Sequence, residues 1–427
     1  MKKFILSTFA FTLGFFSFAQ AWVSDSVEVP GFAKKVYYSL DNGVVGEVAT
    51  NNYDLEISTT LMSSTIRLNG GGPSGVVTRL YYVVGDDTTA WANPIDTTGM
   101  ASGASSILVR CLDSDSIWQQ SAFEFDASGH PDYGWGVYNS STHNLVGKRI
   151  FVMKTHDGTW KRIWIRRLLS AQGIYHIRMA DLDGSNESDF SINKASAGKN
   201  FVNYSLNSAS FADAEPDAQT FDLIFQRYVD ANPNSASVGL AVTGVLQNDG
   251  VESVKAAGLP ADDADISNYI LDTKVNEIGD NWKKLNYVSF QWDVFDSTSY
   301  FIKDIPGNIW QLRFTKFGGS ASGKYVFEKR QIAYASIEES NPILAFAAFP
   351  NPATSQIQLV FNSNAASSVS IQLLDLSGRV VLQENYAAQI GLNQKVVNLS
   401  QVQSSGVYFL RLQDGKTLRS EKIIIQK

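Results

Sequence analysis

The sequence offers almost no sulfur chemistry. Cys111 is the only cysteine among 427 residues, so the chain can form no internal disulfide and no thiolate metal cluster. A catalytic thiol would need a histidine partner and a lowered pKa. Cys111 instead lies in the run Ile107–Leu112, whose mainly apolar residues are typical of a strand, so we predict a buried structural thiol.

Long apolar runs are missing after the first residues. The chain opens with two lysines, continues with the apolar run Phe4–Phe18 and reaches the small-x-small sequence Ala19-Gln20-Ala21. This pattern predicts a signal peptide over residues 1–21, so that the mature protein begins at Trp22. A membrane anchor is the competing interpretation, but the run is short, and no later stretch reaches the ~18 apolar residues of a spanning helix.

Positive charge is scarce. There are 35 Lys and Arg against 42 Asp and Glu, a net charge of -7, and removal of two lysines with the signal peptide leaves 33 against 42, or -9. Nucleic acids and anionic membranes require a basic face, so neither is an expected partner. Charged residues make up only 18% and aromatic residues 12%, which favours strands over helices and predicts an all-β fold.

Three sequence elements occur twice in the same order, which indicates an internal repeat. They are a Tyr-Ser-Leu strand, an aromatic-Asp-Leu strand, and a hairpin with an Asp-Gly or Pro-Gly-Asn turn. The first copy holds Val36–Leu40, Tyr53-Asp54-Leu55 and Phe151–Ile165, and the second holds Val202–Leu206, Phe221-Asp222-Leu223 and Tyr300–Phe314. We expect Asp54 and Asp222 to accept backbone N–H bonds rather than to act in catalysis. We expect core side chains from Trp160 and from Ile163 or Trp164 in the first hairpin, and from Trp310, Leu312 and Phe314 in the second.

Polar stretches near residues 200 and 340 divide the mature chain. They predict β-rich units at 22–200 and 201–340, followed by a tail at 345–427. Every expected strand in the tail is short and every link is turn-like, which predicts a small C-terminal β-sandwich.

Four motifs of the tail stand in a fixed order. They are Phe349-Pro350-Asn351-Pro352, Asp375-Leu376-Ser377-Gly378-Arg379, Ser405-Gly406-Val407-Tyr408-Phe409 and the terminal Lys422-Ile423-Ile424-Ile425-Gln426-Lys427. In these motifs the tail closely resembles the type A C-terminal sorting domain of the type IX secretion system. The resemblance implies that this machinery is a partner, and that the protein passes through the periplasm to the cell surface or the medium.

Several motifs of residues 30–335 resemble another family. They are Tyr38-Ser39-Leu40, Asp157–Lys161, Phe221–Phe225, Val242–Leu246 and Gly307–Phe314. On these residues the two β-units resemble the HmuY-like family of exported haem-binding proteins, although its members have tryptophan where Tyr53 and Phe221 stand. The resemblance implies two tandem HmuY-like units in a binding protein that is not an enzyme, with haem as the candidate cofactor.

Haem capture would require axial ligands, typically two His or Met side chains. Residues 201–340 contain neither residue type, so we expect a haem site in the first unit. The candidate haem ligands are His143, His156, His176, Met153 and Met179. A structural role is open for each histidine: His143 would cap a turn, His156 would lie on the surface of a hairpin, and His176 would alternate with apolar residues on a strand.

Other chemistry lacks a motif. The chain has no Gly-x-Ser-x-Gly elbow, His-Glu-x-x-His helix, phosphate loop or dinucleotide fingerprint, so we expect no enzyme and no metal site. The acidic run Asp181–Glu187 has the acidic spacing of a loop that could hold Ca²⁺, but it lacks the spacing to a terminal bidentate Glu and a flanking helix pair, so it predicts a hairpin turn. Glu124 and Asp126 alternate in an expected strand, an arrangement that does not oppose two carboxylates.

The alternative function is a structural or adhesive surface protein. Exposed aromatic side chains would then contact a glycan or another protein without haem. The candidates are Tyr133, Trp135 and Tyr138.

Overall fold

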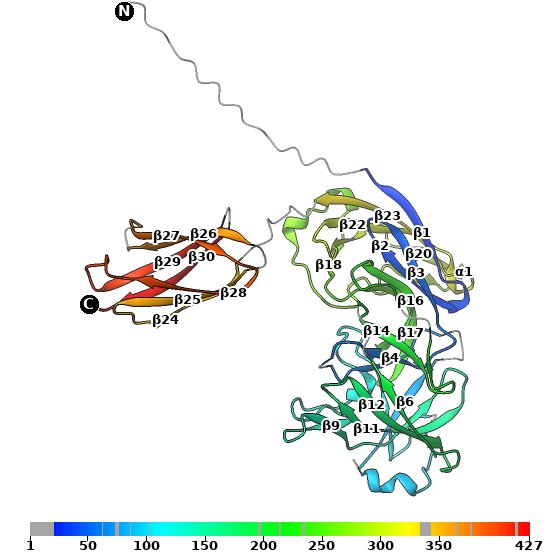
Figure 1. Cartoon of the computed structure of the whole chain (residues 1–427). Helices are drawn as coiled ribbons and strands as arrows, with labels where there is room; N and C mark the ends of the chain where they lie inside the picture. The colour runs from blue at the N-terminus through cyan, green and yellow to red at the C-terminus, as the bar shows by residue number, and fades with distance from the viewer. Residues whose placement is uncertain are drawn as a thin grey trace, which may run out of the picture. The chain divides into compact units, whose positions relative to one another are not determined.

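The computed structural model describes residues 21–427 except 62, 73–76, 86, 101, 195–197, 213–214, 233–234, 334–342, 364–365, 376–377 and 415–416. Apart from Ala21, the predicted signal peptide lies outside the described residues. The chain forms two compact units, Met1–Tyr334 and Ala335–Lys427. Nearly all elements are strands, which confirms the all-β prediction (Figure 1). Within the described residues, no helix is long and apolar enough to cross a membrane.

The first unit contains two lobes, each a core between two sheets. The first lobe buries side chains such as Ile57, Ile163 and Tyr204. Its larger sheet has the order β13 (Ser188–Asn193), β12 (Ile174–Asp181), β11 (Trp160–Leu169), β10 (Phe151–Lys154), β6 (Arg79–Val83) and β7 (Leu108–Cys111), with β9 (Asn144–Gly147) on β11 and β8 (Gly136–Asn139) on β9. Its smaller sheet has the order β15 (Ser210–Phe211), β14 (Phe201–Ser205), β4 (Leu55–Ser58) and β5 (Ile66–Leu68).

The second lobe repeats this layering around a core that includes Tyr38, Phe225 and Leu312. One sheet has the order β1 (Val23–Glu28), β23 (Lys324–Ala333), β22 (Ile309–Phe317), β21 (Thr298–Lys303) and β18 (Glu252–Ala257). The other has the order β17 (Ser235–Gln247), β16 (Leu223–Asn232), β2 (Lys34–Ser39) and β3 (Gly43–Ala49).

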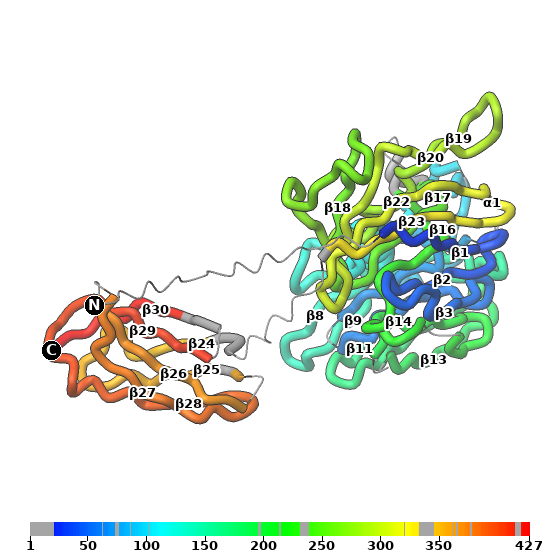
Figure 2. Tube along the Cα trace, turned by 90° about the horizontal axis from the view of Figure 1, so that it is seen from above, coloured from blue at the N-terminus to red at the C-terminus, as the bar shows by residue number. Residues whose placement is uncertain are grey.

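Short elements connect these strands. They are the 3₁₀ helices η1 (Pro30–Phe32), η2 (Thr88–Ala92), η3 (Ala122–Glu124), η4 (Ala261–Asp263) and η5 (Ile266–Asn268), the helix α1 (Gly319–Ser322), and the hairpin of β19 (Lys283–Asn286) and β20 (Gln291–Val294). Figure 2 shows this hairpin projecting from the unit. Its tip carries the exposed side chains of Tyr287, Val288 and Phe290.

The two copies of the repeat exchange strands. β4 of the first copy pairs with β14 of the second, with Leu55 opposite Tyr204. β16 of the second copy pairs with β2 of the first, with Leu223 opposite Tyr38. Figure 1 shows β4 beside β14 and β16 close to β2. Each lobe is therefore completed by a strand from the other copy.

This pairing differs from a tandem arrangement of units at 22–200 and 201–340. The first lobe takes β14 from beyond residue 200, and the second lobe takes β1, β2 and β3 from the start of the chain. The lobes do not coincide with the two copies because each Tyr-Ser-Leu strand is hydrogen-bonded to the aromatic-Asp-Leu strand of the opposite copy.

Asp54 fixes the exchanged strand in the first lobe. Its side chain is fully buried. Oδ2 accepts the backbone N–H of Leu206 at 2.7 Å, and Oδ1 accepts that of His156 at 2.6 Å. One carboxylate thus joins the strand of the second copy to the hairpin of the first.

Asp222 does the same in the second lobe. Its oxygens accept the backbone N–H groups of Leu40 at 2.7 Å and Ile305 at 3.3 Å. The geometry confirms that both repeated aspartates accept backbone hydrogen bonds, a role that buried carboxylates fill by satisfying donors that water cannot reach.

The first hairpin of the repeat joins β10 to β11 through a turn in which Gly158 has a φ of +89°. That left-handed conformation favours glycine, as expected for the predicted Asp-Gly turn. On β11, Ile163 is buried in the core and Trp164 is half-buried on the opposite face. Ile163 therefore supplies the core, and Trp164 faces outward.

Cys111 and Trp22 are two further residues about which the sequence made a prediction. Cys111 is fully buried at the end of β7, as predicted, and burial raises the pKa of its thiol to about 12. Trp22, the predicted first residue of the mature protein, lies between the guanidinium groups of Arg313 and Arg330, at 4.3 and 4.4 Å from its ring. Its indole N–H donates to Asp262 at 2.8 Å.

The second unit is the predicted small β-sandwich. One core with side chains such as Leu359, Ile371 and Leu410 lies between its two sheets. The sheets have the orders β24 (Ile343–Phe349), β25 (Gln356–Ser363) and β28 (Gly391–Asn398), and β27 (Val380–Ala388), β26 (Ser367–Leu374), β29 (Gly406–Asp414) and β30 (Thr417–Ile425).

Candidate functional site

The structure places the three candidate histidines in different surroundings. His143 is exposed at the turn between β8 and β9, with a φ of +57°, and its Nδ1 lies 2.6 Å from the hydroxyl of Tyr138. His156 follows β10, and its Nδ1 lies 2.9 Å from Oδ1 of Asp54. His176 lies on β12, where Nδ1 is 2.9 Å from the Ser191 hydroxyl.

The two candidate methionines belong to the hydrophobic core. Met153 is fully buried there, and Met179 is half-buried against it. Of the five predicted haem ligands, only His176 lines one of the pockets described below. The structure therefore brings Met153 and Met179 into one core but does not gather the histidines around one cleft.

The segment that follows β7 forms the wall of two pockets, and side-chain hydrogen bonds hold it in place. The guanidinium of Arg67 on β5 donates to three backbone carbonyls, those of Ile117 and Trp118 at 3.1 and 3.2 Å and that of Ser114 at 2.7 Å. A fourth bond reaches the carbonyl of Gln120 at 3.2 Å. Arg67 also stacks on the Trp118 ring at 4.9 Å. One buried arginine thus fixes the path of the whole segment.

Asp113 fixes the same segment at its start. Its two oxygens accept the backbone N–H groups of Leu68 at 2.9 Å and Ala122 at 2.8 Å. Burial raises the pKa of Asp113, and Arg67 and the two donors oppose the increase. Asp113 is therefore a structural anchor of the pocket wall.

Glu124 anchors the end of the segment. It accepts the N–H of Ser121 at 3.0 Å and the hydroxyl of Ser64 at 2.8 Å, and burial raises its pKa. The prediction that Glu124 and Asp126 alternate on a strand is wrong, because Ser121 and Glu124 form a capping box on the helix η3 and Asp126 has a φ of +54°. The Ser-x-x-Glu spacing of that box was the available sequence signal.

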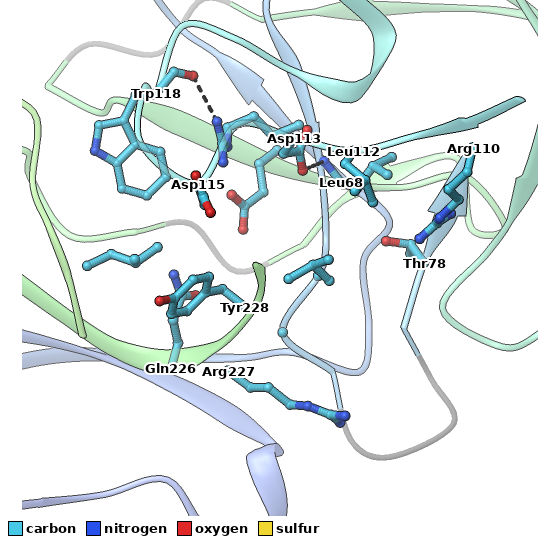
Figure 3. A pocket seen from close by; sticks show the side chains of 16 residues that line it. Leu68, Thr78, Arg110, Leu112, Asp113, Asp115, Trp118, Gln226, Arg227 and Tyr228 are labelled. Atoms are coloured by element: carbon cyan, nitrogen blue, oxygen red, sulfur yellow. Dashed lines mark hydrogen bonds between the residues drawn. The ribbon is translucent and has the colours of Figure 1, made fainter. Parts of the chain in front are cut away.

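A junction pocket lies between the lobes (Figure 3). Arg67, Asp113 and Trp118 of the first lobe and Gln226 and Tyr228 of the second are among its lining residues. Its volume is only about 50 Å³. Because one water needs about 10–15 Å³ and organic ligands need about 300–1,000 Å³, this pocket has room for a few waters but is too small for haem.

An outer pocket is lined by the same segment and shares Arg110, Leu112 and Asp113 with the junction pocket. Its volume is about 610 Å³, which is within the range of ligand sites. It is lined by Arg110, Leu112, Asp113, Ser114, Gln119, Gln120, Ser121, Glu124, Phe125, Asp126, Ala127, Gly129, Asp132 and Tyr133.

Several groups of the outer pocket are available to a ligand. Among the described residues, neither the Asp126 carboxylate nor the Gln120 side-chain amide has a hydrogen-bond partner. The half-buried rings of Phe125 and Tyr133 supply apolar surface beside them. Acidic side chains outnumber the single arginine, so the pocket suits a neutral or cationic ligand better than an anion.

The predicted aromatic surface is only partly exposed. Tyr133 and Tyr138 are half-buried, and Tyr133 lines the outer pocket. The prediction that Trp135 is exposed is wrong, because Trp135 is fully buried in the first core and its indole N–H donates to the carbonyl of Ser64 at 3.3 Å.

The acidic run Asp181–Glu187 forms the predicted hairpin turn between β12 and β13. The N–H of Asp181 donates to the carbonyl of Ser185 at 2.9 Å, and Asp183 accepts the Ser185 hydroxyl at 2.7 Å. Within the described residues, His, Cys, Asp and Glu side chains form no group of three that could hold a metal ion.

Residues 347–426, in the β-sandwich unit, match the model of the Secretion system C-terminal sorting domain. The last part of this chain is a type IX secretion sorting domain. The protein is therefore secreted or displayed at the cell surface, and recognition of the sorting domain makes the type IX machinery its partner. The match ends at the sorting domain and does not extend to the two lobes.

The other comparisons found weak likenesses or none. No curated protein matches it. Among solved structures, dimeric latent PorU from Porphyromonas gingivalis is 11% identical, with 66% of this chain and 32% of that one covered and a TM-score of 0.18. PorZ, described as a surface component of the type IX secretion system of the same organism, is 12% identical, with 75% and 49% covered and a TM-score of 0.16.

The chain thus spans about a third of PorU and half of PorZ. At these TM-scores neither likeness carries an argument about the lobes. The resemblance of residues 30–335 to the HmuY-like family remains a prediction.

Proposed function

We propose that this exported protein binds a glycan in the outer pocket, with an uncharged sugar as the preferred ligand. The observation that carries the proposal is the outer pocket itself, about 610 Å³ of space beside the rings of Phe125 and Tyr133. An aromatic ring packs against the apolar face of a sugar, while free carboxylate and amide groups bond its hydroxyls. Asp126 and Gln120 supply those groups.

The construction of the pocket wall supports this proposal. Arg67, Asp113 and Glu124 hold the wall through bonds that the free protein already contains. Binding would therefore require little ordering of the backbone, which is a large part of the free-energy cost of association. Export by the type IX system brings such a pocket to the cell surface or the medium, where glycans are accessible.

The test is a glycan array probed with the labelled mature protein, residues 22–427, followed by calorimetry on the sugars retained. We expect saturable binding of uncharged glycans that Tyr133→Ala weakens about tenfold, because the ring contributes stacking surface. Tyr138→Ala is the matched control, since Tyr138 bonds His143 and does not line the pocket. Absence of saturable binding, or equal loss in both variants, would contradict the proposal.

Haem capture is the second candidate, and one observation favours it: Nε2 of His176 has no hydrogen-bond partner among the described residues. In the tautomer whose Nδ1–H donates to the Ser191 hydroxyl, Nε2 carries a lone pair that can bind iron. Haemin titration of the mature protein tests it directly. A saturable Soret band abolished by His143→Ala, His156→Ala or His176→Ala would establish haem binding and identify the ligand. A spectrum equal to that of free haemin would exclude this function.

A further inference from the structure

A second ligand-sized pocket lies on the outer face of the first lobe, where β9, β11 and β12 are neighbours. This arginine pocket has a volume of about 310 Å³ and is lined by Val146, Trp164, Arg166, Arg167 and His176. Arg167 lies opposite Val146 on one side and opposite His176 on the other. The residues thus form a row across three strands, remote in sequence but adjacent on the sheet.

A β-bulge creates the positive charge of the pocket. On β11, Ile165 and Leu168 are buried, whereas Arg166 and Arg167 between them are both exposed. The pairing register with β12 shifts between Ile165 and Arg167, so one extra residue turns two consecutive arginines outward. Bulges commonly re-aim side chains next to functional sites.

The surrounding acids do not balance this charge. Arg166 lies 3.4 Å from Asp189, but Arg178 holds the same carboxylate at 2.7 Å and Glu187 at 3.3 Å. Among the described residues, Arg167 has no ion pair, and no acidic side chain lines the pocket. The pocket therefore carries an uncompensated positive charge on a protein whose overall charge is negative.

Two more hydrogen-bonding groups of the pocket are unused. Nε1 of Trp164 and Nε2 of His176 are buried and have no hydrogen-bond partner among the described residues. When the Ser191 hydroxyl donates to Nδ1 of His176, the imidazole proton lies on Nε2. Burial, and then Arg167 and Arg166, lower the pKa of His176, so the ring is neutral and Nε2–H remains a donor at pH 7. Buried donors without acceptors are rare in folded proteins.

We propose that the arginine pocket binds the oxyanion group of a small ligand: a phosphate, a sulfate or a carboxylate. Guanidinium groups bind such anions through two parallel charged hydrogen bonds, and the N–H groups of Trp164 and His176 supply neutral donors beside them. The inference is independent of the proposed glycan site, because the two pockets share no residue.

The test is isothermal titration of the mature protein with inorganic phosphate, sulfate and glucuronate, at constant ionic strength set by chloride. We expect saturable binding of at least one anion, and the anion preferred distinguishes a phosphate, a sulfate or a sugar-acid ligand. Arg167→Gln should weaken that binding about tenfold or more, because it removes one charged donor pair. His176→Gln should weaken it less, because the amide retains a donor.

Arg379→Gln is the matched control for the change in net charge. Arg379 is largely exposed in the sorting domain, far along the sequence from the pocket. Equal loss of binding in Arg379→Gln and Arg167→Gln would show nonspecific attraction and overturn the inference. No saturable heat with any of the three anions would overturn it as well, and a circular dichroism spectrum matching wild type excludes misfolding of the variants.

Discussion

The buried carboxylate of Glu215 makes the stability of the first unit sensitive to pH. Oε1 of Glu215 accepts the backbone N–H groups of Phe201, at 2.9 Å, and Asn200. Lys35, the cation that lowers the pKa of Glu215, is already paired with Glu56 at 2.7 Å, and both side chains of that pair are largely buried. Burial therefore raises the pKa of Glu215 from 4.5 to about 7, against the opposing effects of the two N–H donors and Lys35.

The sign of the effect follows from proton linkage. Because the folded pKa exceeds the unfolded one, the folded state binds more protons between about pH 4.5 and 7, and ionisation of Glu215 lowers the free energy of unfolding across that window. A difference of about 2.5 pKa units, at about 1.4 kcal/mol per unit, corresponds to about 3 kcal/mol. Glu215→Gln removes the charge and keeps an oxygen that accepts the same N–H bonds.

The assay is urea unfolding of the mature wild type and Glu215→Gln at pH 4 and pH 8. We expect equal stability at pH 4, where Glu215 is protonated, and a variant more stable by up to about 3 kcal/mol at pH 8. The transition of the sorting domain should not move and serves as the internal control. A variant that is less stable at pH 8, or a difference that is the same at both pH values, would refute the reasoning.

Two further predictions concern buried groups. Asp54→Ala should lower the free energy of unfolding by about 2–4 kcal/mol, because it leaves the N–H groups of His156 and Leu206 buried without acceptors. In the same urea titration, substitution of the exposed Asp296 by Ala should change this free energy by less than about 0.5 kcal/mol. Similar losses in both variants would contradict the structural role of Asp54. Cys111 should not react with a thiol reagent such as dithionitrobenzoate in the native protein and should react fully in denaturant; rapid native reaction would contradict its burial.

Local patterns predicted much of the fold. Apolar alternation and turn residues indicated strands. The repeated motif identified Asp54 and Asp222, one in each copy, and predicted that both accept backbone hydrogen bonds. The same motifs could not show that the copies exchange strands, because Tyr-Ser-Leu is followed by aromatic-Asp-Leu in each copy and either pairing satisfies the local pattern. Which copy provides the partner strand is decided by packing over more than a hundred residues.

The candidate sites were harder to predict, because they depend on contacts that no short motif contains. Arg67 organises the pocket wall by binding carbonyls some fifty residues later, and any residue type presents a carbonyl. The positive face of β11 depends on one bulge that reverses the expected alternation at Arg166 and Arg167. Counting His and Met residues selected the first lobe but could not separate Met153, a core residue, from His176, which lines a pocket.

The reciprocal strand exchange affects how the protein withstands cleavage by proteases outside the cell. The turn residues 207–209 between β14 and β15 are exposed, and exposed turns are preferred sites of proteolytic cleavage. A cut there would separate a fragment carrying β2 and β4 from one carrying β16, yet β2 stays paired with β16. β1 of the first fragment likewise remains paired with β23 of the second. The severed pieces would stay interlocked, so the protein keeps its shape after a break that would release a domain from a tandem array.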